Sequence, residues 1–156
     1  MGKGTDVVDP AKVEGRVRLL DGYLKVLRRL AKLAQQELIG DPIPLGSAKY
    51  YLQVAVESCI DMANHIIASE RLRAPKDYAD IFKVLAEEGI IPPDFLPELQ
   101  RMARFRNRLV HLYWEVDAEV IYDILQERLG EFERYRGCII AALERSSGHG
   151  DNRDKR

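Results

Sequence analysis

The chain carries few of the features that mark secreted or membrane proteins. Its only two cysteines, Cys59 and Cys138, form no CxxC pair, so we expect apolar core residues rather than a metal or redox site. No apolar run approaches the 18 or so residues that a membrane span needs. The opening stretch MGKGTDVVDP also lacks the apolar segment of a signal peptide. We therefore expect a cytoplasmic protein that has no contact with a membrane.

A strong charge of one sign is also missing. The 156 residues include 24 basic and 25 acidic side chains, and the formal net charge is −1. This balance gives the molecule as a whole no electrostatic attraction to a polyanion. Any site for a polyanion must therefore depend on local clustering, and arginines do cluster between positions 101 and 108.

What the sequence does contain is helical periodicity. Apolar residues recur at alternating steps of four and three from Val13 to Leu38, after Asp9-Pro10, which is typical of a capped helix start. Gly40-Asp41-Pro42 is expected to end this helix. Four further helices are predicted over about 47–71, 77–88, 94 to the arginine-rich segment, and 117–143. We predict an all-α protein, an antiparallel bundle of about five helices.

The length predicts one domain. We place this helical domain at residues 10–145 and expect residues 1–9 and the tail 146–156, SSGHGDNRDKR, to be disordered. The second helix has apolar side chains outside its main stripe, among them Tyr50, Val56 and Ile60. Two apolar faces favour a homodimer, unless the helix is simply central in its own bundle.

Positive charge is concentrated near the segment RFRNRLVHLY, residues 104–113. Four guanidinium groups, each forked to bind phosphate oxygens, occur within eight residues: Arg101, Arg104, Arg106 and Arg108. Helical steps of three and four put three of them on one outward face, whereas Arg106 points to the more apolar side. An unpaired charge there is costly. Arg106 is therefore either paired with an internal carboxylate or held for an anionic ligand.

His111 follows Arg106 by five residues. A five-residue step rotates an ideal helix by about 140°, so the two side chains share a face only if the helix distorts or ends between them. Asp117, as the next capping residue, indicates an end nearby. On the residues alone, His111 is explained as well by a structural role as by a catalytic one.

The second helix supplies another polar set. Steps of four and three place Glu57, Asp61 and Asn64 on one of its sides. One interpretation is a face that is open to solvent. The other is a carboxylate pair that orients Arg106 or His111 from the neighbouring helix, and the residues leave both open.

The arginine-rich segment contains a recognisable motif. From Arg106-Asn107 to His111 and Tyr113 it reads R-N-x3-H-x-Y. This resembles the R-x4-H motif of HEPN-domain ribonucleases, in the extended R-x4-H-x-Y form of the HepT toxins. Three longer segments also resemble HepT sequences: YYLQVAVESCIDMANHII (50–67), DYADIFKVLAEEGII (77–91) and MARFRNRLVHLYWEVD (102–117). The resemblance covers roughly residues 10–145.

The resemblance implies a homodimer in which the two copies of the motif meet and cleave RNA with neither a metal nor a cofactor. His111 would be the general acid or base at the ribose 2′-OH or the leaving oxygen, because imidazole titrates near neutral pH. Arg106 would stabilise charge on the phosphate, and Asn107 would position substrate or hold the arginine.

Other residues would assist this site. The outward arginines Arg101, Arg104 and Arg108 would bind RNA. In support of the catalytic pair, the polar set on the second helix would contribute Glu57, Asp61 and Asn64.

HepT proteins are paired with a minimal nucleotidyltransferase that serves as the antitoxin. In that pairing the tyrosine of the motif, here Tyr113, accepts AMP. The added bulk and negative charge would stand two residues from His111, where the RNA phosphate must bind. Tyr113 could instead be an interfacial aromatic with a hydrogen-bonded hydroxyl. For the whole chain, the alternative is a non-catalytic HEPN dimer that binds nucleotide or docks a nucleotidyltransferase.

Overall fold

The computed structural model describes residues 9–150, with side chains for residues 9–148. No strand occurs in that range, so the all-α prediction is confirmed. The elements in chain order are α1 (Pro10–Ala31), α2 (Gln35–Ile39), α3 (Pro42–Ser69), α4 (Tyr78–Glu87), α5 (Leu96–His111), the 3₁₀ turn η1 (Tyr113–Glu115), α6 (Ala118–Glu127) and α7 (Leu129–Gly150).

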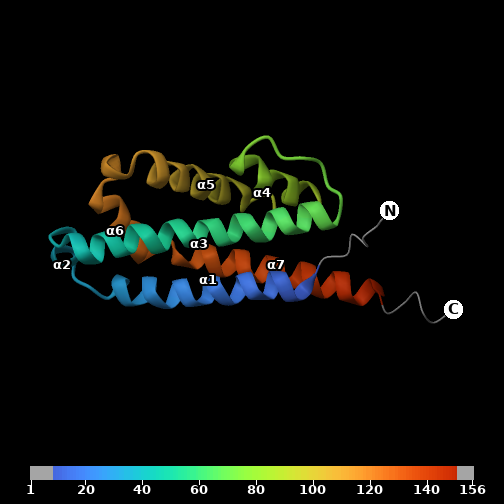
Figure 1. Ribbon diagram of the computed structural model, residues 1–156, viewed down its shortest axis with the longest axis horizontal. Helices are drawn as coiled ribbons and strands as arrows, with labels where there is room; N and C mark the ends of the chain where they lie inside the picture. The colour runs from blue at the N-terminus through green and yellow to red at the C-terminus, as the bar shows by residue number, and fades with distance from the viewer. Residues whose placement is uncertain (1–8, 151–156) are drawn as a thin grey trace.

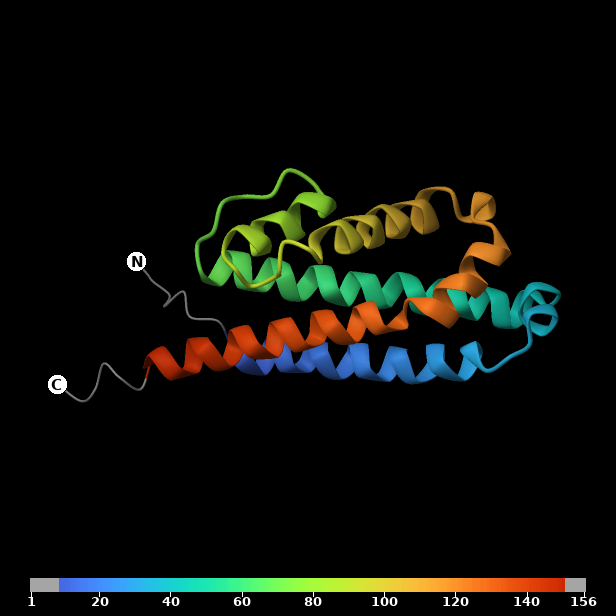
Figure 2. The ribbon, with the colours of Figure 1, turned by 180° about the vertical axis from the view of Figure 1, so that it is seen from behind.

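Helix α3 runs through the middle of the bundle (Figures 1 and 2). It has α1 and α7 on one side and α4 and α5 on the other, and α6 joins α5 to α7 at the end where α2 lies. This position buries residues around most of its circumference, including Val56 at 0% and Ile60 at 4% exposure. The two apolar faces of α3 are therefore explained by its central place and are not in themselves a reason for a homodimer. Tyr50 is an exception, with 56% exposure.

Aspartate side chains begin four of the helices. Each accepts a hydrogen bond from a backbone N–H two or three residues further on, which satisfies a donor that the helix itself leaves free. These caps are Asp9, Asp41, Asp77 and Asp117. The prediction for Gly40-Asp41-Pro42 was wrong in part, because this stretch starts α3 at Pro42 instead of leaving a loop up to Ser47. Proline suits the first helical position, where no N–H is needed.

The first and last predicted helices are each interrupted. Ala34 is extended (φ −64°, ψ 151°) and separates α1 from α2, while Arg128 (φ −120°, ψ 0°) separates α6 from α7. The described range therefore holds seven α-helices instead of about five. Helix α7 also continues to Gly150, beyond the expected boundary at residue 145. The remaining parts of the predicted disordered ends, 1–8 and 151–156, lie outside the described residues.

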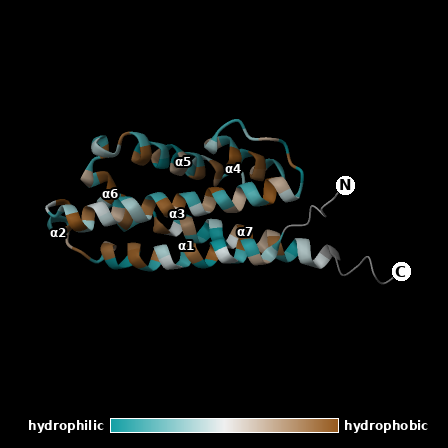
Figure 3. Cartoon of the chain, viewed as in Figure 1, coloured by the Kyte–Doolittle hydropathy of each residue, from teal (hydrophilic) through white to brown (hydrophobic). Residues whose placement is uncertain are grey.

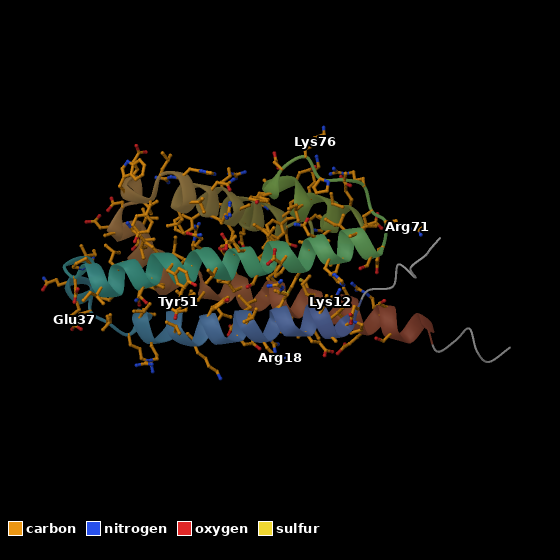
Figure 4. The ribbon with its side chains drawn as sticks, in the orientation of Figure 1. Lys12, Arg18, Glu37, Tyr51, Arg71 and Lys76 are labelled. Atoms are coloured by element: carbon orange, nitrogen blue, oxygen red, sulfur yellow. The ribbon has the colours of Figure 1, made fainter. Side chains whose placement is uncertain are left out.

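Apolar and polar residues alternate around the helices (Figure 3), and no helix of the described part is long and apolar enough to span a membrane. Tyr51 lies between α3 and α1 (Figure 4), with its ring centroid 6.0 Å from that of Tyr23. In the core, the hydroxyl of Tyr135 donates to the carbonyl oxygen of Cys59 at 2.7 Å. Burial raises the pKa of the Cys59 thiol, which keeps it protonated, as expected of an apolar core cysteine. Cys138 is half-buried.

Candidate active site

The motif occupies the last turns of α5 and the turn that follows. The helix is continuous through Arg106 and ends at His111, because Leu112 leaves the helical region (φ −133°, ψ 42°). The N–H of Leu112 donates to the carbonyl oxygen of Arg108 at 2.8 Å and closes the last turn. Arg106 and His111 therefore stand on one uninterrupted helix, about 140° apart around its axis. The helix does not end between them.

Arg106 points into the protein, where its guanidinium group contacts Glu57, Asn107 and Tyr78. Its Nε and Nη2 donate to Oε1 of Glu57 at 3.2 and 3.0 Å, and its Nη1 donates to Oδ1 of Asn107 at 3.2 Å. The Arg106 side chain is 16% exposed and that of Glu57 34% exposed, so the pair is partly shielded from water. Gln53, one turn earlier on α3, donates to the same Glu57 oxygen at 3.1 Å. Charge-assisted contacts of this kind fix a guanidinium plane.

The ring of Tyr78 provides the remaining contact with Arg106. The guanidinium carbon lies 4.9 Å from the ring centroid, within the range of a cation–π interaction. Tyr78 is the first residue of α4, directly after the capping Asp77, so the start of that helix positions the ring. Tyr78 was not predicted as a site residue, because no spacing within α4 indicates which helix its first turn faces.

His111 lies on the surface of the single chain. It is exposed, and no described residue forms a hydrogen bond or an ion pair with its ring. Its position in the last turn of α5 suits a cation, because helix C-termini carry partial negative charge. An accessible imidazole can exchange protons with a bound substrate. In one chain, however, it lies about 140° around the axis of α5 from Arg106.

Tyr113 is held by a buried lysine. Lys49 of α3 is 7% exposed, and its Nζ donates to the carbonyl oxygen of Tyr113 at 3.2 Å and lies 4.4 Å from the centroid of the tyrosine ring. Tyr113 nevertheless remains accessible, with 43% exposure. Lys49 was not predicted as a site residue, although a lysine within the apolar run around Ala48 and Leu52 was a usable signal.

The other arginines of α5 lie as predicted on the outside. Arg101, Arg104 and Arg108 are all exposed, while Arg106 is not. Arg101 borders a small apolar hollow with Met102 and is the furthest of the three from His111 along the helix. Arg104 and Arg108 stand nearer to the end of α5 and leave positive charge beside the motif.

The polar set on α3 does not act as one group. Glu57 contacts Arg106, but Asp61 instead faces Arg16 of α1, with 3.6 Å between Nη1 and Oδ2. Asp61 and Asn64 line an open groove between α1 and α3, and neither contacts Arg106 or His111 in the described part of the chain. The prediction that all three residues support the same site was therefore wrong for Asp61 and Asn64, since only Glu57 contacts Arg106. Within residues 9–148, no three His, Cys, Asp or Glu side chains gather into a group that could hold a metal ion.

Known proteins resemble this chain in sequence and in fold. The family described as Ribonuclease HepT-like matches residues 20–139. The mRNA nuclease HepT of Shewanella oneidensis is 34% identical over 90 residues, which are 58% of this chain and 68% of that protein. A chain of the crystal structure of a toxin-antitoxin MntA-HepT mutant superposes with a TM-score of 0.77 at 26% identity and covers 83% of this chain and 98% of that one. A structure of a tri-AMPylated Shewanella oneidensis HEPN toxin in complex with an MNT antitoxin superposes with a TM-score of 0.61 at 29% identity, over 78% and 96% of the two chains.

Proposed function

The chain belongs to the ribonuclease HepT-like family, and we propose that it is the RNA-cleaving toxin of a toxin–antitoxin pair. By family it is an endoribonuclease. The observation that carries the proposal is the complete R-N-x3-H-x-Y motif on α5 and the turn after it, with Arg106 fixed by Glu57 and Asn107 and with the imidazole of His111 open to a substrate. A cytoplasmic location belongs to the same proposal, because the RNA substrate is found there.

The reacting groups are proposed to be completed by a second copy of the chain. On one α5 helix, Arg106 and His111 diverge by about 140°, so they do not approach one phosphate from the same face. In a symmetric dimer, the same patch of each copy meets at the interface, and two motifs can then surround one substrate. Val110 and Leu112, which flank His111 and are 39% and 38% exposed, would be covered in such a dimer.

The proposed reaction is transfer of the phosphate to the adjacent 2′-oxygen. The 2′-OH loses its proton as its oxygen bonds to phosphorus, and the leaving 5′-oxygen gains a proton as its bond to phosphorus breaks. His111 would take or supply these protons, and Arg106 would stabilise the charge that develops on the phosphate oxygens. Because DNA lacks the 2′-OH, the reaction would be restricted to RNA. No step requires a metal ion.

Neutralisation is proposed to act through Tyr113. A nucleotidyltransferase partner would transfer AMP from ATP to the phenolic oxygen, which loses its proton as pyrophosphate leaves. The product carries a phosphodiester charge two residues from His111. The 43% exposure of Tyr113 supports this assignment, since a transferring enzyme must reach this side chain. A related HEPN toxin with three AMP groups, bound to an MNT antitoxin, gives further support. Tyr113→Phe should abolish incorporation of AMP by the partner; transfer to another residue such as Tyr122 would contradict the assignment.

The decisive experiment is cleavage of RNA by the purified protein in EDTA. The unmodified wild type should cleave, His111→Ala should not, and His65→Ala should cleave like the wild type because this imidazole lies in the groove between α1 and α3. Mass spectrometry must first exclude AMP on Tyr113, and sedimentation must show that the variants keep the oligomeric state of the wild type. A folded, unmodified and inactive wild type would favour the non-catalytic dimer that docks a nucleotidyltransferase or binds nucleotide.

A further inference from the structure

The turn after the motif presents an unusually exposed aromatic side chain. Trp114 is the only tryptophan of the 156 residues, and 77% of it is exposed. Its two neighbours in the turn are Tyr113 and Glu115, so the indole stands directly beside the motif. Tryptophan has the largest apolar surface of any side chain, and leaving most of it in water forgoes stabilisation that burial would provide. A ligand that covered this indole would therefore gain the stabilisation that the fold leaves unused.

The backbone under the indole is fixed at several points. The N–H groups of Glu115 and Val116 donate to the carbonyl oxygens of Leu112 and Tyr113, at 2.9 and 3.4 Å. Lys49 donates to the same Tyr113 carbonyl oxygen at 3.2 Å. The side chain of Val116 is 4% exposed and anchors the far end of the turn in the core. Trp114 is therefore displayed on a rigid support, which lowers the entropy lost when a flat ligand binds against it.

The charges around the turn indicate what that ligand is. Arg104 and Arg108 are exposed on α5, in the turns that lead to Trp114, whereas Glu115 is the exposed acid on the turn itself. A polyanionic backbone is thus attracted along α5, whereas the indole beside Glu115 offers a flat apolar face and not a site for phosphate. A single RNA strand has this division of charge, with phosphates along one edge and unstacked bases free to lie on aromatic rings.

We propose that Trp114 is a stacking platform for an unpaired base of the RNA substrate. The inference rests on the proposed ribonuclease function and adds to it a residue that binds substrate without taking part in the chemistry. It also restricts the substrate class, since a base within a stable duplex is not available to stack. Cleavage should therefore be confined to single-stranded regions such as loops.

Because Trp114 is the single tryptophan, its fluorescence reports directly on this contact. We would titrate the unmodified wild type with a short single-stranded 2′-O-methyl oligonucleotide, which lacks the nucleophilic hydroxyl, and follow in parallel the anisotropy of the labelled oligonucleotide. The indole emission should be quenched with the same saturation as the anisotropy. An oligonucleotide that binds without changing the emission overturns the stacking inference and leaves the nuclease proposal intact. Failure of RNA to bind or be cleaved at all overturns both.

A second copy of the chain is the competing occupant, and protein concentration separates it from RNA. If the indole belonged to a dimer interface, its emission without RNA would already be that of a buried indole and would shift to longer wavelengths on dilution. That result overturns the inference. Emission typical of an exposed indole at every concentration supports it.

Two substitutions then distinguish stacking from apolar contact. Trp114→Leu keeps an apolar side chain but removes the ring, and should raise KM for single-stranded RNA by roughly 5- to 150-fold with little change in kcat. Trp114→Phe should restore much of the loss, and Ile43→Ala, which truncates another exposed apolar residue, should leave KM unchanged. Equal KM values for the wild type and both Trp114 variants would refute the platform.

Discussion

Replacing Glu57 by glutamine tests whether the carboxylate on α3 holds Arg106. The change keeps the size of the side chain and one carbonyl oxygen but removes the charge that faces the guanidinium. In the structure a single oxygen of Glu57 accepts from Nε and Nη2 of Arg106, at 3.2 and 3.0 Å, and from Gln53 at 3.1 Å. These contacts connect α3 to α5, so their loss should lower both the free energy of unfolding and kcat.

The size of the effect follows from the exposure of the pair. Breaking a fully buried ion pair costs about 3–5 kcal/mol, whereas an exposed pair is worth about 0–1 kcal/mol. With the Arg106 side chain 16% exposed and that of Glu57 34% exposed, the pair lies between these limits. We expect Glu57→Gln to lower the free energy of unfolding by about 1–2 kcal/mol, since glutamine keeps one acceptor. For a chain of this length that corresponds to a decrease in Tm of roughly 2–8 °C.

Urea unfolding followed by circular dichroism would measure the change, and cleavage of RNA under conditions where both proteins are folded would measure kcat. The matched control is Asp61→Asn, one turn further along α3, whose partner Arg16 is 3.6 Å away and about half exposed. It should cost less than about 0.5 kcal/mol. If Glu57→Gln unfolds like the control and cleaves like the wild type, Glu57 does not hold Arg106 in a position that catalysis needs.

Two further predictions concern α4. Tyr78→Leu should lower kcat several-fold, whereas Tyr78→Phe should retain it. Only the leucine variant loses the ring face that lies 4.9 Å from Arg106, a contact worth about 0.5–2 kcal/mol. Equal kcat values for the two variants would exclude a role for the ring. The Arg73 guanidinium and the N–H of Lys76 hold the pKa of the Asp80 carboxyl far below its usual range. Because the folded pKa is depressed, the stabilisation is complete above the ordinary value of about 3.9 and is lost as pH falls below it. Asp80→Asn should therefore have a lower free energy of unfolding than the wild type near neutral pH, and that free energy should fall less steeply as the pH is lowered into the acid range. Urea unfolding at several pH values would measure both. An equally steep fall in the variant and the wild type would contradict the prediction.

Several features of the fold were predictable because they depend on neighbours in the sequence. The 3.6-residue recurrence of apolar side chains indicates helices wherever it is uninterrupted, and Asp9, Asp77 and Asp117 begin helices through hydrogen bonds to their own first turns. The error at Asp41-Pro42 was avoidable, because this pair has the same capping chemistry as Asp9-Pro10. The break at Ala34 had no comparable local signal.

The candidate site was predictable only in part. Its helix, its motif and the inward direction of Arg106 follow from spacing on α5. The contribution of Glu57 but not of Asp61 does not, because the two carboxylates are one turn apart on the same side of α3 and only the position of α5 relative to α1 decides which cation each meets. Tyr78 reaches Arg106 for the same reason, through the placement of the start of α4.

The sequence by itself determined that this chain is helical and where most of its helices begin, and it predicts that one segment carries the chemistry of a phosphate-cleaving site. These properties follow from hydrogen bonds and periodicity within a few residues. The tertiary structure alone decided that α3 is central, that Lys49 holds Tyr113, and that most of the Trp114 side chain is exposed. Such contacts join residues far apart in the chain, and their energies depend on the packing of whole helices, which no local pattern encodes.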